Sequence, residues 1–140
     1  MTRKLLFFIL LAVSGLCRAQ DLCSLGIGGP DHEIIAEVFQ LSQDQVKTMR
    51  NLGAELKFRN EIFELRAERL LKNHAQSSPE DLLKMSYDYR DLLDSMRNNS
   101  VRIDKRMLAV FNQDQYNLYI QLCNQAYRSP IFALRSVDEK

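Results

Sequence analysis

Apolar residues recur every three or four positions along two long stretches of the chain, residues 43–73 and 79–110. This spacing places them on one face of an α-helix. In the second stretch, steps of three and four alternate over about four heptads, which is the spacing of a helix–helix seam. The first apolar stripe contains Val46, Met49, Leu52, Leu56, Phe63, Ala67 and Leu70, with Ile62 beside it. The second contains Leu82, Met85, Tyr89, Leu92, Met96, Ile103, Met107 and Val110, and is interrupted by Ser100.

Two shorter helices are predicted on either side of this pair, over residues 31–39 and 113–127. Pro130 suits the end of the last helix. The connection 74–78 is short, so the two long helices should be antiparallel neighbours. The sequence therefore predicts an all-α fold, a long antiparallel helical hairpin flanked by two shorter helices.

The predicted lengths leave part of the hairpin uncovered. A helix of about 30 residues is about 45 Å long, and neither flanking helix is long enough to cover it. Apolar surface that remains open in this way usually marks an interface. We therefore expect a homodimer of hairpins.

One pattern occurs twice, at residues 41–46 and 111–116, where the second and fourth helices begin. A large apolar residue precedes a short polar residue suited to an N-cap, and Gln follows three positions after the cap. This is a capping box, in which the cap side chain and the Gln side chain each bond the other's backbone N–H. The residues are Leu41, Ser42 and Gln45 in the first copy and Phe111, Asn112 and Gln115 in the second.

The doubled pattern resembles the two LTxxQ-type repeats of the Spy/CpxP family of periplasmic helical proteins, and the similarity covers nearly all of residues 31–128. Ser42 and Asn112 replace the motif's Thr, and Phe111 replaces its Leu, but all three keep the capping chemistry. The resemblance implies a thin, curved, antiparallel dimer. It also implies a role such as ATP-independent chaperone, envelope-stress regulator or metal-responsive protein.

The ends of the chain have other compositions. Residues 1–19 combine a basic start, a short apolar run and small residues before a cleavage site after Ala19, which predicts a signal peptide and export. The resemblance to the Spy/CpxP family implies that the exported protein is periplasmic. Residues 20–30 contain a glycine-rich run and are predicted to be a flexible N-terminal arm. Residues 31–128 form the helical domain and residues 129–140 a C-terminal tail. No stretch after the signal is long and apolar enough to span a membrane.

Two cysteines, Cys23 and Cys123, follow the signal peptide. In an exported protein they can pair, and the disulfide would tie the N-terminal arm to the last helix. The chain-entropy model gives closure of so long a loop a stabilisation of about 4–5 kcal/mol. The alternative is two separate thiols, one in the arm and one on a helix face.

Catalytic and metal-binding patterns are weak. The chain has no phosphate-binding glycine loop, HExxH or GxSxG motif, so we expect no enzyme and no cofactor. Asp31, His32, Glu33 and Glu37 could offer metal ligands, as could Met85, Met96 and Met107. Acids at a helix start and methionines in a seam have commoner structural explanations, so no metal site is predicted. With 19 basic against 18 acidic residues, the charge balance does not suggest nucleic acid as a partner.

The long helices also carry cations interleaved with apolar residues outside the seam. Such a surface could hold unfolded or membrane-associated proteins, because apolar burial is non-directional and charge speeds encounter. The alternative is an ordinary solvated helix face. The proposed client-binding residues are Lys57, Phe58, Arg66, Arg69, Tyr87, Arg90, Arg97 and Val101.

These observations predict an exported, non-enzymatic protein-binding protein, a periplasmic chaperone or envelope-stress modulator. One alternative is a periplasmic metal-binding sensor or resistance protein of the same fold. Another is a secreted helical-bundle signalling protein, which the glycosylation sequon at Asn98 would allow.

Overall fold

The computed structural model describes residues 21–134, and this part of the chain is all-helical. The helices are α2 (His32–Val38), α3 (Gln43–Asn73), α4 (Pro79–Ala109) and α5 (Gln113–Gln125). The predicted fold class is confirmed, and both long helices begin at the predicted residues. The predicted signal peptide (1–19) and the last part of the tail (135–140) lie outside the described residues.

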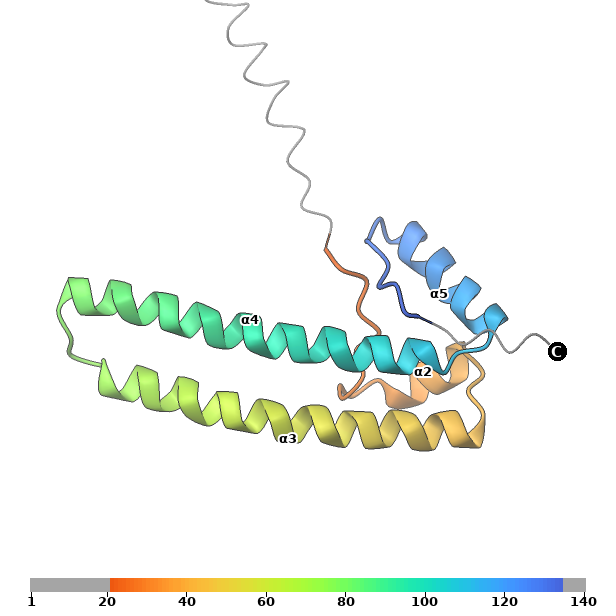
Figure 1. Cartoon of the computed structure of the whole chain (residues 1–140), viewed down its shortest axis with the longest axis horizontal. Coiled ribbons are helices and arrows are strands. Elements are labelled where there is room, and N and C mark those ends of the chain that lie inside the picture. Colours follow the sequence, from red (N-terminus) through yellow and green to blue (C-terminus); the bar gives the residue numbers. More distant parts are fainter. Residues whose placement is uncertain (1–20, 135–140) are drawn as a thin grey trace, which may run out of the picture.

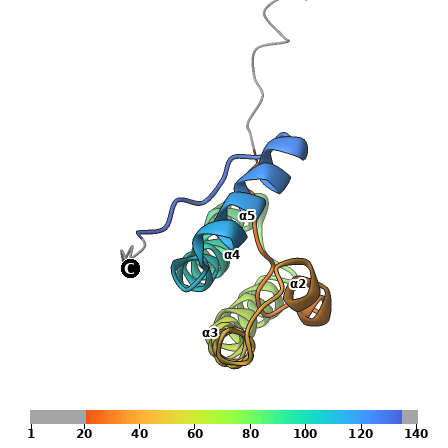
Figure 2. The ribbon, with the colours of Figure 1, turned by 90° about the vertical axis from the view of Figure 1, so that its right-hand side faces the viewer.

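Helices α3 and α4 run antiparallel along their whole length and form a helical hairpin (Figure 1). The other elements gather at one end of it, which we call the proximal end. Viewed along the hairpin, α2 lies beside α3 and α5 beside α4 (Figure 2). Residues 57–98, which include the connection between the long helices, form the distal half. The short helices therefore cover one end of the hairpin only.

Both predicted capping boxes are formed. The Ser42 hydroxyl accepts the Gln45 N–H at 3.3 Å, and the Gln45 side-chain oxygen accepts the Ser42 N–H at 2.9 Å. At the start of α5, the equivalent bonds between Asn112 and Gln115 are both 2.9 Å. The helix starts are therefore set by local sequence, as the capping chemistry requires.

The two boxes also bind each other, which the sequence did not predict. The Gln45 amide donates to the Gln115 side-chain oxygen at 2.8 Å, and the Gln115 amide donates to the Gln45 side-chain oxygen at 3.0 Å. Gln45 donates in addition to the Val110 carbonyl, and Gln115 to the Phe39 carbonyl. The repeated motif thus joins the start of α3 to the start of α5, and it fixes the ends of α2 and α4 between them.

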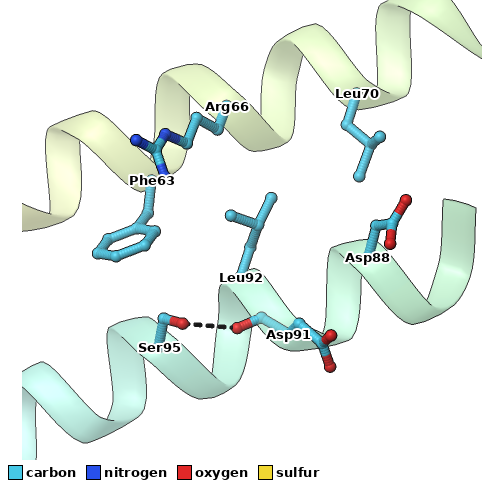
Figure 3. Close-up of a pocket in the computed structure, with 7 residues that line it drawn as sticks. All are labelled: Phe63, Arg66, Leu70, Asp88, Asp91, Leu92 and Ser95. Atoms are coloured by element: carbon cyan, nitrogen blue, oxygen red, sulfur yellow. Dashed lines mark hydrogen bonds between the residues drawn. The ribbon is translucent and has the colours of Figure 1, made fainter.

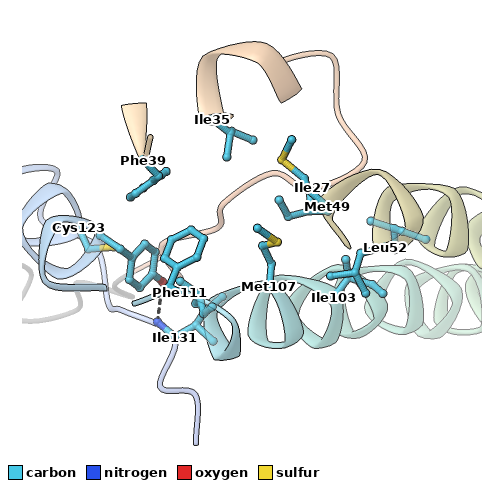
Figure 4. Packing of buried hydrophobic residues seen from close by; sticks show 13 residues of the cluster. Ile27, Ile35, Phe39, Met49, Leu52, Ile103, Met107, Phe111, Cys123 and Ile131 are labelled. Carbon is cyan, nitrogen blue, oxygen red and sulfur yellow. Dashed lines mark hydrogen bonds between the residues drawn. The ribbon is translucent and has the colours of Figure 1, made fainter. Parts of the chain in front are cut away.

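The hydrophobic core lies at the proximal end (Figure 4). It receives residues from every helix and from both terminal segments, because two helices alone cannot enclose a core. By contrast, none of residues 57–98 is buried. The core residues are Ile27, Ile35, Phe39, Met49, Leu52, Leu56, Ile103, Met107, Leu108, Phe111, Tyr119, Cys123 and Ile131.

The prediction of a flexible arm over residues 20–30 was wrong for its described part. Residues 21–27, which we call the strap, lie against α4 and α5, and Ile27 is in the core. Gly28, with φ +90°, then turns the chain toward α2, so close to Gly53 that a Cβ would meet Leu56 at 3.2 Å. Glycine serves here for a positive φ and for close packing.

The strap is joined to the rest of the molecule at several points. Cys23 and Cys123 form a disulfide bond. The Tyr119 hydroxyl donates to the Cys23 carbonyl at 2.7 Å and accepts the Ile131 N–H at 2.8 Å. Ser129 pairs with the strap through backbone hydrogen bonds to Asp21 and Cys23. The first residues of the predicted tail are therefore docked, whereas Phe132 and Leu134 point into solvent.

Candidate functional site

The distal half of the hairpin exposes an unusual amount of apolar surface. Eight large apolar side chains between residues 57 and 98 are 40–66% exposed. Contiguous apolar patches on a soluble chain mark interaction sites more often than isolated residues do. The eight are Phe58, Ile62, Leu65, Leu71, Leu82, Leu83, Tyr87 and Leu93.

Three of these side chains form a stripe along α3. Phe58, Ile62 and Leu65 follow one another at steps of four and three, so they share one helix face. These residues lie about 100–160° around the helix from Phe63, which faces α4 (Figure 3), so the stripe points away from the seam. We call these three residues the α3 outer stripe. Sequence reading placed Ile62 beside the seam and did not single out Leu65, because the broader seam pattern obscured this second stripe.

Three other residues lie on the side of the hairpin that the strap and α2 cover at the proximal end. Leu93 is three turns before Asp104 on α4, and Asp104 bonds the strap. Leu71 is five turns after Gly53 on α3, and Gly53 packs against His32 of α2. Leu82 is three turns before Leu93. We call Leu71, Leu82 and Leu93 the open side. They lie on the same side of the hairpin as the strap and α2, but beyond the part that these two segments cover.

The seam itself is incompletely closed in the distal half. Phe63 and Leu70 of α3 face Leu92 of α4 across a groove of about 340 Å³ (Figure 3). Polar side chains line the edges of the groove, among them Arg66, whose guanidinium lies 5.8 Å from the Phe63 ring centre. The groove is open to solvent along one side of the seam.

The structure does not bring the predicted client-binding residues onto a single face. Seven of the eight are exposed in the distal half, but Val101 is partly buried against the core. Phe58 lies about 140° around α3 from Phe63, and Tyr87 lies about 140° around α4 from Leu92. Because Phe63 and Leu92 face each other, Phe58 and Tyr87 point away from each other. The Arg90 guanidinium lies over the Tyr87 ring at 5.2 Å, which keeps this cation beside apolar surface. The exposed members are Lys57, Phe58, Arg66, Arg69, Tyr87, Arg90 and Arg97.

The residues considered as metal ligands have structural roles or stand apart. The His32 ring accepts the Gly28 N–H through Nε2 at 2.9 Å and packs on Gly53. Met107 is in the core, whereas Met85 and Met96 are half-buried in the seam. Within residues 21–134, no three His, Cys, Asp or Glu side chains are grouped as metal ligands would be. No helix in the same range has the length and apolarity to cross a bilayer.

Shifted pKa values occur at the proximal end and have structural causes. Burial raises the pKa of the Asp104 carboxyl, more than hydrogen bonds from Ser24 and the strap backbone lower it. Burial also raises the pKa of the Tyr119 hydroxyl. A hydrogen bond from Arg106 lowers the pKa of Glu55, which bridges α3 and α4. These three groups belong to the packing of the strap and the hairpin.

Comparison of the chain with protein-family models, curated protein sequences and solved structures gives no match. The resemblance to the Spy/CpxP family therefore depends on the two capping boxes and on the order of the helices.

Proposed function

We propose that the protein is an exported, non-enzymatic protein-binding protein that holds apolar segments of unfolded chains on the distal half of its hairpin. The observation that carries this proposal is that residues 57–98 contain no buried residue and eight exposed large apolar ones. Such surface gains about 25 cal/mol for each Å² that a partner removes from water. Non-directional burial of this kind tolerates many client sequences.

The charges of the distal half fit the same role. Arg66 and Arg90 lie beside aromatic rings, and other exposed cations and acids alternate along both helices. This mixture keeps an apolar surface soluble and loosely attractive to chains of either charge. A holding role needs weak, multiple contacts, and it needs no nucleotide or metal.

The resemblance to the Spy/CpxP family supports the proposal from a separate direction. Its implied roles, ATP-independent chaperone or envelope-stress modulator, require export, which the signal-like residues 1–19 with cleavage after Ala19 would provide. The metal-sensor alternative is less well supported, because the His32 ring is already used by Gly28 and Gly53.

We propose in addition that the α3 outer stripe is the face on which two copies pair, with their hairpins antiparallel. The stripe has the alternating spacing of four and three that helix–helix seams use. The open side, on a different face of the hairpin, would stay available for clients. The proposed dimer and the proposed client site therefore use different residues and can be tested separately.

The client site is tested with an aggregation assay on an unrelated, chemically unfolded protein, without ATP. We expect the wild-type chain to suppress aggregation, and Leu71→Ser with Leu93→Ser to weaken this several-fold. Leu134→Ser is the matched control, because Leu134 is a fully exposed leucine outside the distal half. No protection by wild type at molar excess, or an equal loss in the control, would contradict the proposal.

The dimer is tested by measuring the mass in solution. We expect wild type to sediment as a dimer and Phe58→Ser with Leu65→Ser to sediment as a monomer that keeps its helical content. A wild-type chain that is monomeric at all concentrations would remove the dimer and leave the client site in place.

A further inference from the structure

The strap is an extended segment that already lies on the hairpin side where we place clients. It crosses α4 at the proximal end of that side, and Ile27 enters the core beside Met49 (Figure 4). Gly28 and Gly29 separate it from α2. An extended segment that ends at a glycine pair can swing away without disturbing the helix that follows.

The polar contacts of the strap converge on one buried carboxylate. Asp104 is 1% exposed, and it accepts the Ser24 hydroxyl at 2.7 Å, the Leu25 N–H at 2.8 Å and the Ile27 N–H at 3.2 Å. All of these donors belong to the strap. If the strap leaves, Asp104 loses these neutral donors and its cover at the same time, so water can replace the lost hydrogen bonds and the carboxyl is not left buried without a partner.

The disulfide is the covalent attachment that prevents this departure. Cys123 on α5 has no exposed surface, whereas Cys23 in the strap is only partly buried. While the bond is intact, the strap is fixed at Cys23 and again where the chain enters α2. Without it, the packing of Leu25 and Ile27 and the hydrogen bonds of the strap backbone and Ser24 remain to hold the segment down.

We propose that the Cys23–Cys123 disulfide is a releasable latch, and that its reduction by a dithiol frees the strap and extends the open side into the proximal half of the hairpin. A thiolate of the dithiol attacks the sulfur of Cys23, the less buried of the two cysteines, and the Cys123 thiolate leaves and takes up a proton. The second thiol of the dithiol then displaces Cys23. The dithiol is oxidised to a disulfide by two electrons, and its two protons end on the two cysteines.

Release of the strap on reduction can occur whatever the protein's function is. Regulation of client binding by this release rests on the proposed function. Release removes Ile27 from the core and uncovers Asp104 and its surroundings on α4. This surface lies three turns from Leu93 on the same side of α4. The reduced protein would therefore offer a longer apolar surface to a client than the oxidised protein offers.

The latch is tested by hydrogen exchange of the full exported chain, with and without dithiothreitol as the dithiol. We expect reduction to speed exchange of the Leu25 and Ile27 amides at least tenfold and to leave the Met107 amide, in the last turn of α4, unchanged. Unchanged strap amides would overturn the proposal. An equal increase at Met107 would also overturn it, since the effect would then be global unfolding.

Two variants separate the covalent bond from the carboxylate. Cys23→Ser with Cys123→Ser should reproduce the exchange of the reduced wild type without a reductant. Asp104→Asn, with the disulfide intact, should speed exchange at Leu25 and Ile27 and leave the Cys23 amide, which bonds Ser129, protected. If the variant with both cysteines replaced by serine does not fold, the reduced wild type and Asp104→Asn still test whether the disulfide holds the strap. Strap amides that stay protected in both would overturn the latch.

The aggregation assay connects the latch to client binding. We expect reduction to increase protection per molecule at least twofold, and to do so also in the chain with Leu71→Ser and Leu93→Ser. Faster strap exchange with no protection in either redox state would overturn the proposed function and leave the latch standing. Protection that is independent of redox state, with unchanged strap exchange, would overturn the latch alone.

Discussion

The two halves of the hairpin are built from the same two helices and the same seam, yet only one half has a core. At the proximal end, Met49, Leu52, Ile103 and Met107 are almost completely buried. In the distal half, seam residues such as Leu92 are only half-buried. The seam pattern is similar in both, so the difference comes from the third layer that the strap, α2 and α5 supply at one end. A pair of helices needs such a layer to remove its apolar face from water.

The largest expected effect is the loss in free energy of unfolding when a leucine is replaced by alanine in the proximal half, compared with the same change in the distal half. Leu108→Ala removes a side chain with no exposed surface, and should lower the free energy of unfolding by about 2–5 kcal/mol. Leu93→Ala, on the same helix but about half exposed, should change it by about 0.5 kcal/mol or less. Urea unfolding measures both. Equal losses would show that the distal half has a core of its own.

A second, smaller effect concerns the paired capping boxes that close the proximal end. Gln115→Ala leaves the Phe39 carbonyl and the Asn112 N–H without these partners, which should cost about 1–3 kcal/mol. Because Gln45 and Gln115 bond each other, the double variant should cost less than the sum of the single ones, by about 0.5–3 kcal/mol. Gln43→Ala, in the same first turn of α3, is the control. Additive losses would mean that the boxes act independently.

A third effect is the pH dependence of the proximal end. Burial raises the pKa of Asp104 above its ordinary 3.8, so the folded protein binds this proton more tightly than the unfolded chain does. Stability contributed by protonation is therefore gained as the pH falls through the raised pKa, and is complete below the unfolded value. Wild type should gain stability relative to Asp104→Asn when urea unfolding is repeated at decreasing pH. A difference that moves in the opposite direction would contradict this assignment.

The smallest effect is expected at the boundary between the halves, where Glu55 of α3 meets Arg106 of α4 at 2.6 Å and Arg59 at 3.0 Å. These side chains are largely solvated, and surface ion pairs contribute little to stability. The visible change should be in titration: Arg106→Gln should raise the pKa of Glu55 toward its ordinary value, as followed by NMR. An unchanged titration would show that the contact is not maintained in solution.

The sequence predicted the helix starts well because capping is local chemistry. Ser42 and Asn112 each cap the helix that they were expected to begin, and Ser78 caps α4 in the same way. In each case the cap and its partner are three residues apart, so their bonds depend on no distant part of the chain. The uncovered surface also followed from the sequence, because helix lengths can be compared without knowing how the helices pack.

The strap and the contact between the two boxes could not be predicted in the same way. The strap bonds to Asp104, about eighty positions away, and a glycine-rich run is equally typical of a flexible arm and of a tightly packed one. The pairing of Gln45 with Gln115 requires α3 and α5 to begin side by side, which no local pattern specifies. The proposed client-binding residues were predicted from their positions outside the seam, and their division between outward faces became visible only when the helices were placed.

The disulfide has one more consequence, because Cys23 and Cys123 are 100 positions apart and enclose both long helices in a covalent ring. The turn at residues 74–78 is at the tip of this ring, well separated from the core. A protease that cuts the turn once would open the ring without releasing a fragment, and the nicked chain would migrate as two pieces only after its cysteines had been reduced. A single cut in this turn therefore leaves both parts of the chain covalently joined.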